Sequence, residues 1–102
     1  MDDKLIYGLL VEAARSNQTM TYSELCTRLG TGISPNSGKL HSALCDISAA
    51  EHTIGRAMLS AVVVNILTGL PGDGFFEQAT SLGYQIIDRR AFWLEQRELL
   101  LR

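Results

Sequence analysis

The stretch from Thr21 to Gly30 defines a short helix at both of its ends, and this feature constrains the fold most. Glu24 follows Thr21 by three residues, the spacing of a capping box in which each side chain binds the backbone N–H of the other residue. The apolar side chains recur on one helix face: Tyr22, Leu25, Cys26 and Leu29. Gly30 is the expected stop, because the residue after a helix often needs a positive φ. The sequence therefore predicts an amphipathic helix over these residues.

Further helices are predicted on both sides of this one. Residues 2–16 carry one apolar stripe, made of Leu5, Ile6, Leu9, Leu10 and Ala13. Farther along, Ser34 is the expected cap of a third helix with Pro35 at its first position, where the missing N–H costs nothing. The buried stripe of this third helix is expected to be Leu40, Ala43, Leu44 and Ile47. Residues 51–56 are ambiguous, with a frayed turn that ends at Gly55 as one interpretation.

The pattern then changes. Residues 58–67 are rich in β-branched side chains and are apolar on both faces, which is typical of a buried strand. Residues 68–74 form a loop dense in turn formers. Asp73 is the expected cap of a fourth, short helix that ends at Gly83 and carries Phe75, Phe76, Ala79 and Leu82.

The end of the chain completes the expected order of elements. Residues 84–87 fit a second short strand, and residues 89–101 fit a last helix with a broad apolar face. The whole is an α+β fold that is mainly α: three helices, a buried strand, a short helix, a short strand and a C-terminal helix. Three helices followed by a strand match the winged-helix form of the helix-turn-helix plan. The 102 residues fit a single domain, residues 1–102.

Charge and composition narrow the function classes. The 9 Lys and Arg residues against 11 Asp and Glu give a net charge of −2, so composition shows no strong basic patch of the kind typical of nucleic-acid binders. Two cysteines make neither a disulfide framework nor a zinc spacing. No apolar run approaches the roughly 18 residues of a membrane span, and the N-terminus lacks secretory-signal features. We expect a cytoplasmic protein with no membrane contact, no metal and no cofactor.

The helix-turn-helix plan predicts a DNA contact. The third helix of such a protein enters the major groove, and its first residues contact base edges. In this chain those residues are Asn36, Ser37, Lys39, His41 and Ser42. Asn, Lys and Ser can bind adenine, guanine or phosphate, and Arg28 and Arg56 are candidates for phosphate contacts. The leading hypothesis is a small non-enzymatic module, regulatory or accessory, that binds double-stranded DNA.

A resemblance to a known family points the same way. Residues 21–30, Thr-Tyr-Ser-Glu-Leu-Cys-Thr-Arg-Leu-Gly, resemble the T-Y-G-E-[IL]-A-x-x-[LV]-G stretch of the alkylguanine-DNA alkyltransferase and alkyltransferase-like winged-helix proteins. The resemblance extends loosely to residues 40–44 and 92–94, and it implies a helix-turn-helix that binds the DNA minor groove. The Pro-Cys-His-Arg motif of that family, whose cysteine accepts the alkyl group, is missing, since residues 61–65 read Ala-Val-Val-Val-Asn. Alkyl transfer is therefore excluded, and no enzymatic activity is predicted.

The rival hypothesis is a protein-interaction module, such as an inhibitor, an immunity protein or an adaptor, on the same scaffold. The outward face of the third helix is small and uncharged, which favours the close approach of a partner: Gly38, Ser42, Cys45 and Ala49. The expected partner surface is Pro71, Asp73, Phe75, Phe76 and Trp93. One of the two adjacent phenylalanines is expected to face the core and the other partly outward. The C-terminal helix ends in three leucines, which cannot all face one side, so it also offers a surface for a homodimer.

Overall fold

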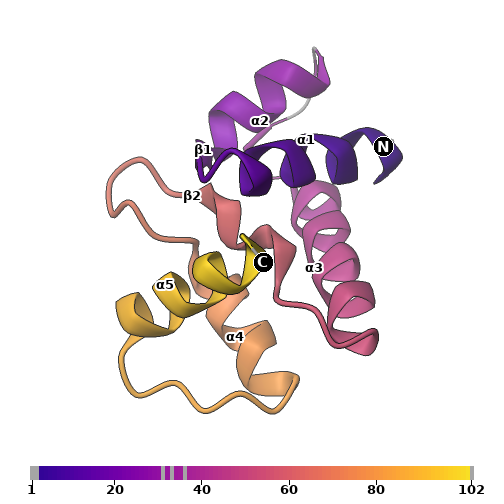
Figure 1. Ribbon diagram of the computed structural model, residues 1–102. Helices are drawn as coiled ribbons and strands as arrows, with labels where there is room; N and C mark the ends of the chain where they lie inside the picture. The colour runs from indigo at the N-terminus through magenta and orange to yellow at the C-terminus, as the bar shows by residue number, and fades with distance from the viewer. Residues whose placement is uncertain (1–2, 31, 33, 36, 102) are drawn as a thin grey trace.

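The computed structural model describes residues 3–30, 32, 34–35 and 37–101. In chain order its elements are α1 (Asp3–Arg15), β1 (Met20–Thr21), α2 (Tyr22–Leu29), α3 (Gly38–Thr53), the 3-10 helix η1 (Leu59–Val62), β2 (Val63–Val64), α4 (Asp73–Ser81) and α5 (Arg89–Leu100) (Figure 1). The described chain is mainly helical with one two-stranded sheet, which confirms an α+β fold that is mainly α. None of the described helices is long and apolar enough to cross a membrane.

Helix α2 has the ends that the sequence predicts. The Glu24 N–H donates to Thr21 Oγ1 at 3.1 Å, and the Thr21 N–H donates to Glu24 Oε1 at 3.2 Å, so both halves of the capping box are formed. Gly30 follows the helix with φ = 116°, and its N–H donates to the carbonyl of Cys26 at 3.2 Å. This conformation is accessible to glycine at little cost, which explains why α2 ends there.

Helix α3 begins later than the sequence predicts. Its cap is Ser37, whose Oγ accepts a hydrogen bond from the Leu40 N–H at 3.4 Å. The expected start, with Ser34 as the cap and Pro35 in the first turn, is therefore wrong. The physical reason is a separate turn, in which the Ser37 N–H donates to the carbonyl of Ser34 at 2.9 Å. At its other end the helix continues through the ambiguous segment as far as Thr53, and Gly55 follows with φ = 79°.

The long strand predicted over residues 58–67 is wrong. Residues 59–62 of that run form η1, and only Val63 and Val64 form a strand. They pair in parallel with β1, so that Met20 lies opposite Val63 and Thr21 opposite Val64. A run that is apolar on all sides indicates burial, but it does not distinguish a strand from another buried conformation.

The reason for this burial is that η1 and β2 run between two hydrophobic clusters. Among the described residues, the first cluster joins α1, α2 and α3 to Leu59, Val62 and Val63. The second cluster joins α4 and α5 to Met58, Ala61 and Val64. Figure 1 shows the same division, with α1, α2 and α3 on one side of the η1–β2 segment and α4 and α5 on the other. Residues of this one segment therefore contribute to both clusters.

The second half of the chain contains both predicted helices but not the predicted strand. Helix α4 starts at Asp73 itself, with Gly72 as its cap, so the expected capping role of Asp73 is wrong. Residues 84–87 pair with no strand in the described structure; the Tyr84 ring packs against Phe92 at 5.2 Å instead. Helix α5 is tied to the central segment, because the Trp93 indole N–H donates to the carbonyl of Ala61 at 2.7 Å.

Candidate interaction site

A loop with an exposed tip, residues 65–72, connects β2 to α4; we call it the 65–72 loop. At its tip the side chains of Ile66 and Leu67 are 80% and 91% exposed. In Figure 1 the loop extends away from the body of the molecule between β2 and α4. Two large aliphatic side chains at such exposure distinguish this loop from the buried segment that precedes it.

Hydrogen bonds within the loop fix its shape. The Asn65 N–H donates to the carbonyl of Leu70 at 2.8 Å, and the Gly69 N–H donates to the carbonyl of Asn65 at 2.8 Å. The Asn65 side chain adds a third bond, because its Oδ1 accepts from the Leu67 N–H at 2.9 Å. The Leu70 N–H also donates to Thr68 Oγ1 at 3.1 Å. The tip is therefore held by an ordered backbone.

Tyr22 joins the base of the loop to α2. Its Oη accepts a hydrogen bond from the Gly72 N–H at 2.9 Å, across 50 positions of sequence. The Tyr22 ring also lies 5.4 Å from the His41 ring, centroid to centroid, so α2, α3 and the loop meet at this side chain. Burial raises the pKa of the Tyr22 phenol and outweighs the opposing effect of the Gly72 hydrogen bond, while Cys45 adds a smaller rise. The phenol thus stays neutral at physiological pH.

Two pockets share Tyr22, His41 and Gly72 as walls. The outer one, about 240 Å³, opens between the start of α2, Pro35 and Ile66 of the loop. The inner one, about 130 Å³, reaches Cys45 and the start of α4. Burial raises the pKa of the Cys45 thiol, and the neighbouring Asp46 raises it further, so this thiol is a poor nucleophile at neutral pH.

The pocket lining is almost free of charge. Among its lining residues only Asp73 carries a carboxylate, and Asp73 forms an ion pair with Arg89 at 2.7 Å. His41 Nε2 lies 3.1 Å from the carbonyl of Pro35, which fixes the ring. This arrangement offers no isolated ionic partner for a charged ligand.

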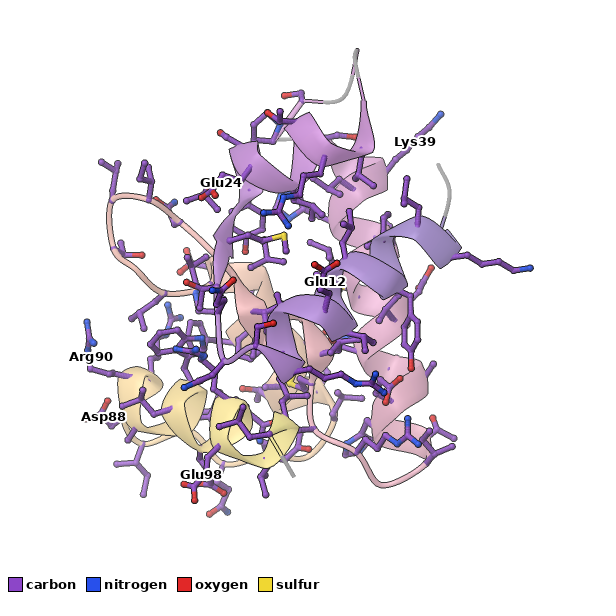
Figure 2. All side chains as sticks on the ribbon, turned by 45° about the horizontal axis from the view of Figure 1, so that its top comes forward. Glu12, Glu24, Lys39, Asp88, Arg90 and Glu98 are labelled. Carbon is purple, nitrogen blue, oxygen red and sulfur yellow. The ribbon has the colours of Figure 1, made fainter. Side chains whose placement is uncertain are left out.

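The predicted DNA-contact residues lie mostly at one end of the molecule. Lys39 and Ser42 are exposed on the first two turns of α3, and Arg28 is exposed in the last turn of α2. Ser37 is half-buried as the α3 cap, and Asn36 lies outside the described residues. In Figure 2 Lys39 projects into solvent near the end of α2. Lys39 and Ser42 therefore face solvent on the first two turns of α3, and Arg28 faces solvent in the last turn of α2.

The charges around Lys39 are mixed. Lys39 and Ser42 share a shallow depression with Asp3 and Asp46. Within the described part of the chain, neither Lys39 nor Arg28 forms an ion pair, although two acids lie near the lysine. Both cations are therefore able to bind a phosphate group. The two carboxylates near Lys39 weaken the positive potential there.

Arg56 and His41 are placed differently from the rest of the set. Arg56 lies beyond the opposite end of α3 and pairs with Glu51 at 3.6 Å. His41 remains exposed, but its ring is held between Tyr22 and the carbonyl of Pro35. The structure thus places Lys39 and Ser42 together at the start of α3 and separates Arg56 from them.

The residues predicted for a protein partner are mainly in the core. Phe75 and Phe76 are 7% and 3% exposed, so the expectation that one of them faces outward is wrong. Pro71 and Trp93 are buried as well. Asp73 is exposed but paired with Arg89, whose guanidinium also lies 4.7 Å above the Phe76 ring. The four buried side chains of this predicted surface therefore contribute to stability. Of the five predicted residues, only Asp73 is accessible to a partner.

The sequence pattern does not reveal that Ile66 and Leu67 are accessible. Because these two residues continue the apolar run of residues 58–64, the pattern predicts them in the buried strand. The signal that they lie in a loop is Asn65, a residue that interrupts strands and favours turns.

Among the described residues, no three His, Cys, Asp or Glu side chains gather in a group that could hold a metal ion. A comparison of the chain with protein-family models, with curated proteins and with solved structures found no match.

Proposed function

We propose that this protein is a winged-helix module that binds duplex DNA and is not an enzyme. The observation that carries the proposal is the exposure of the first two turns of α3, with Lys39 and Ser42 accessible and Arg28 nearby in α2. Helix α3 follows α2 in the chain position of a recognition helix, although residues 30–37 form a longer connection than the turn of about 3–4 residues that is typical of the motif.

The order of elements supports the winged-helix assignment. Strand β2 follows α3 and pairs with β1, which leads directly into α2. The 65–72 loop, which comes next, occupies the place of a wing. The resemblance of residues 21–30 to the alkyltransferase winged-helix proteins points in the same direction.

Because Arg28 and Lys39 are only two candidate phosphate contacts, the affinity for duplex DNA should depend weakly on salt concentration. Log K falls with log salt by about 0.9 for each phosphate neutralised in duplex DNA. If Arg28 and Lys39 each bind one phosphate, the slope is about −1.8, and a four-fold rise in salt weakens binding about twelve-fold. The DNA contact must then depend on interactions other than charge.

The test is fluorescence anisotropy with a mixed-sequence duplex at about 50 and 200 mM salt, a range that reveals phosphate contacts. Lys39→Ala and Arg28→Ala are each expected to reduce the slope by about one. The matched control is Arg90→Ala, because Arg90 is an exposed cation on α5, on the opposite side of the molecule in Figure 2. No binding at the lower salt, or equal losses in all three variants, would refute the proposal.

The outer face of α5 favours a second candidate, a protein contact that includes a homodimer. Leu94 and Leu101 lie seven residues apart, hence on one side of the helix, and about half of each side chain is exposed. Ile87, just before the helix, is fully exposed. Size-exclusion chromatography with light scattering tests the homodimer: the chain should run as a dimer and Leu94→Lys as a monomer. A monomeric wild type would exclude this contact between copies.

A further inference from the structure

Ile66 and Leu67 form a narrow apolar tip rather than a broad apolar patch. The other large apolar side chains that are exposed in the described structure lie on α1, at the end of α3, just before α5 and on α5. The residues on either side of the pair are polar, Asn65 and Thr68. A typical protein–protein interface buries about 800 Å² on each partner, far more than two side chains provide. The shape therefore fits insertion into a narrow site.

Hydrogen bonds hold the tip of the loop in one shape and tie the base of the loop to α2, one of the proposed DNA-binding helices. Bonds from Asn65 and Thr68 hold the backbone of the loop, and the Tyr22 hydroxyl holds its base at Gly72. Ile66 also lines the outer pocket opposite His41 of α3. The tip thus borders the same pocket as His41, one of the predicted DNA contacts, whereas Lys39 and Ser42 line a separate depression of α3.

We propose that the 65–72 loop enters the DNA minor groove and inserts Leu67, supported by Ile66, between two stacked base pairs. This inference rests on the proposed function. Proteins of the minor groove commonly insert Leu, Ile, Phe, Met or Pro at a base step, which unstacks the step and bends the duplex. A preformed loop suits this role, because little ordering is needed on binding.

The inserted pair Ile66 and Leu67, which we call the wedge, also adds binding free energy that the few cations near α2 and α3 do not provide. Among the described residues of α2 and α3, the cations Arg28 and Lys39 form no ion pair, and acids lie near Lys39. Insertion of aliphatic side chains removes apolar surface from water without any phosphate contact. Binding of this kind selects deformable sites, and pyrimidine–purine steps such as TA unstack most easily.

The experiment measures unstacking directly. The probe is a mixed-sequence duplex with one 2-aminopurine at a central TA step, where fluorescence is quenched by stacking and rises when the step opens. The wild-type chain is expected to raise the fluorescence several-fold at saturation. Leu67→Ser should abolish this rise and weaken binding about ten-fold, the loss of one buried aliphatic side chain. Circular dichroism verifies that the variant folds.

Ile54→Ser is the matched control, because Ile54 is also an exposed aliphatic side chain but lies at the end of α3, outside the loop. It should leave both the fluorescence rise and the affinity unchanged. If Leu67→Ser also leaves both unchanged, the wedge is refuted and the tip is left to a protein partner. If the wild type binds with the expected salt slope but gives no fluorescence rise, the wedge alone fails. If the wild type does not bind the duplex, the proposed function fails with it.

Discussion

Two apolar pairs in this protein have opposite environments. Ile66 and Leu67 are almost fully exposed, whereas Phe75 and Phe76, nine residues later, are almost fully buried. Both pairs border residues rich in glycine and turn formers. Hydrophobicity alone therefore does not decide which pair is in the core.

The difference comes from the backbone to which each pair is attached. Phe75 and Phe76 stand in the first turn of α4, where both rings pack in the second cluster and meet edge to face at 5.1 Å. Ile66 and Leu67 follow Asn65, whose hydrogen bonds close a loop that turns the pair outward. Phe75 and Phe76 therefore stabilise the core, whereas Ile66 and Leu67 remain accessible at the surface.

The largest expected effect is on the buried pair. Phe76→Ala removes a buried ring from the second cluster and leaves a cavity, so the free energy of unfolding should fall by about 3–5 kcal/mol. Denaturant unfolding measures this loss. A fall below about 1 kcal/mol, the size of a typical surface effect, would contradict the core role of this ring.

A smaller effect is expected at the residue that shapes the loop. Asn65→Ala removes the hydrogen bond from the Leu67 N–H to Asn65 Oδ1, which should cost about 1 kcal/mol of stability. The same change loosens the tip and should lower the 2-aminopurine signal. Asn65→Asp keeps an acceptor oxygen and is the control. Equal behaviour of the two variants would show that the side-chain hydrogen bond does not hold the tip.

The tyrosine at the base of the loop predicts a dependence on pH. Because burial raises the pKa of Tyr22 above its ordinary 10.0, the folded state keeps a proton that the unfolded chain releases. The stability gained from Tyr22 is therefore complete below about pH 10 and is lost as the pH rises through the folded pKa. Denaturant midpoints between pH 9 and 11 should fall less steeply in Tyr22→Phe. An identical fall would contradict the burial of this phenol.

The smallest expected effect is at the exposed pair. Leu67→Ser removes a side chain that contacts little of the folded protein, so the free energy of unfolding should change by no more than about 0.5 kcal/mol. Thermal unfolding beside Phe76→Ala gives the comparison directly. A loss of more than about 2 kcal/mol, in the range of a buried leucine, would place Leu67 in the core and break the contrast.

The sequence predicts those parts of the fold that depend on local signals. The capping box of α2 and its stop at Gly30 are correct because both are set within a few residues. The start of α3 was misplaced because Ser34 and Ser37 are both good caps, and the turn between them decides. The strand predicted over residues 58–67 is wrong because only tertiary packing shows that residues 58–64 run between two clusters.

The candidate site was predictable only in part. Arg28, Lys39 and Ser42 follow from the helix positions, and the structure shows that all three are exposed. The separation of Arg56 and the burial of Phe75 and Trp93 depend on long-range packing, which a single sequence does not reveal. The hydrogen bond between Tyr22 and Gly72 spans 50 positions and leaves no local signal.

The most direct test of the central claim is an NMR titration of the ¹⁵N-labelled chain with a short mixed-sequence duplex. If the proposed DNA contacts form, the backbone signals of Lys39 and Ser42 in α3 should shift on addition of the duplex. The signals of Arg28 in α2 and of Ile66 and Leu67 in the loop should shift as well. Arg90 and Leu94 on α5 should remain unchanged. Shifts confined to α5, or no saturable shifts at low salt, would contradict the account.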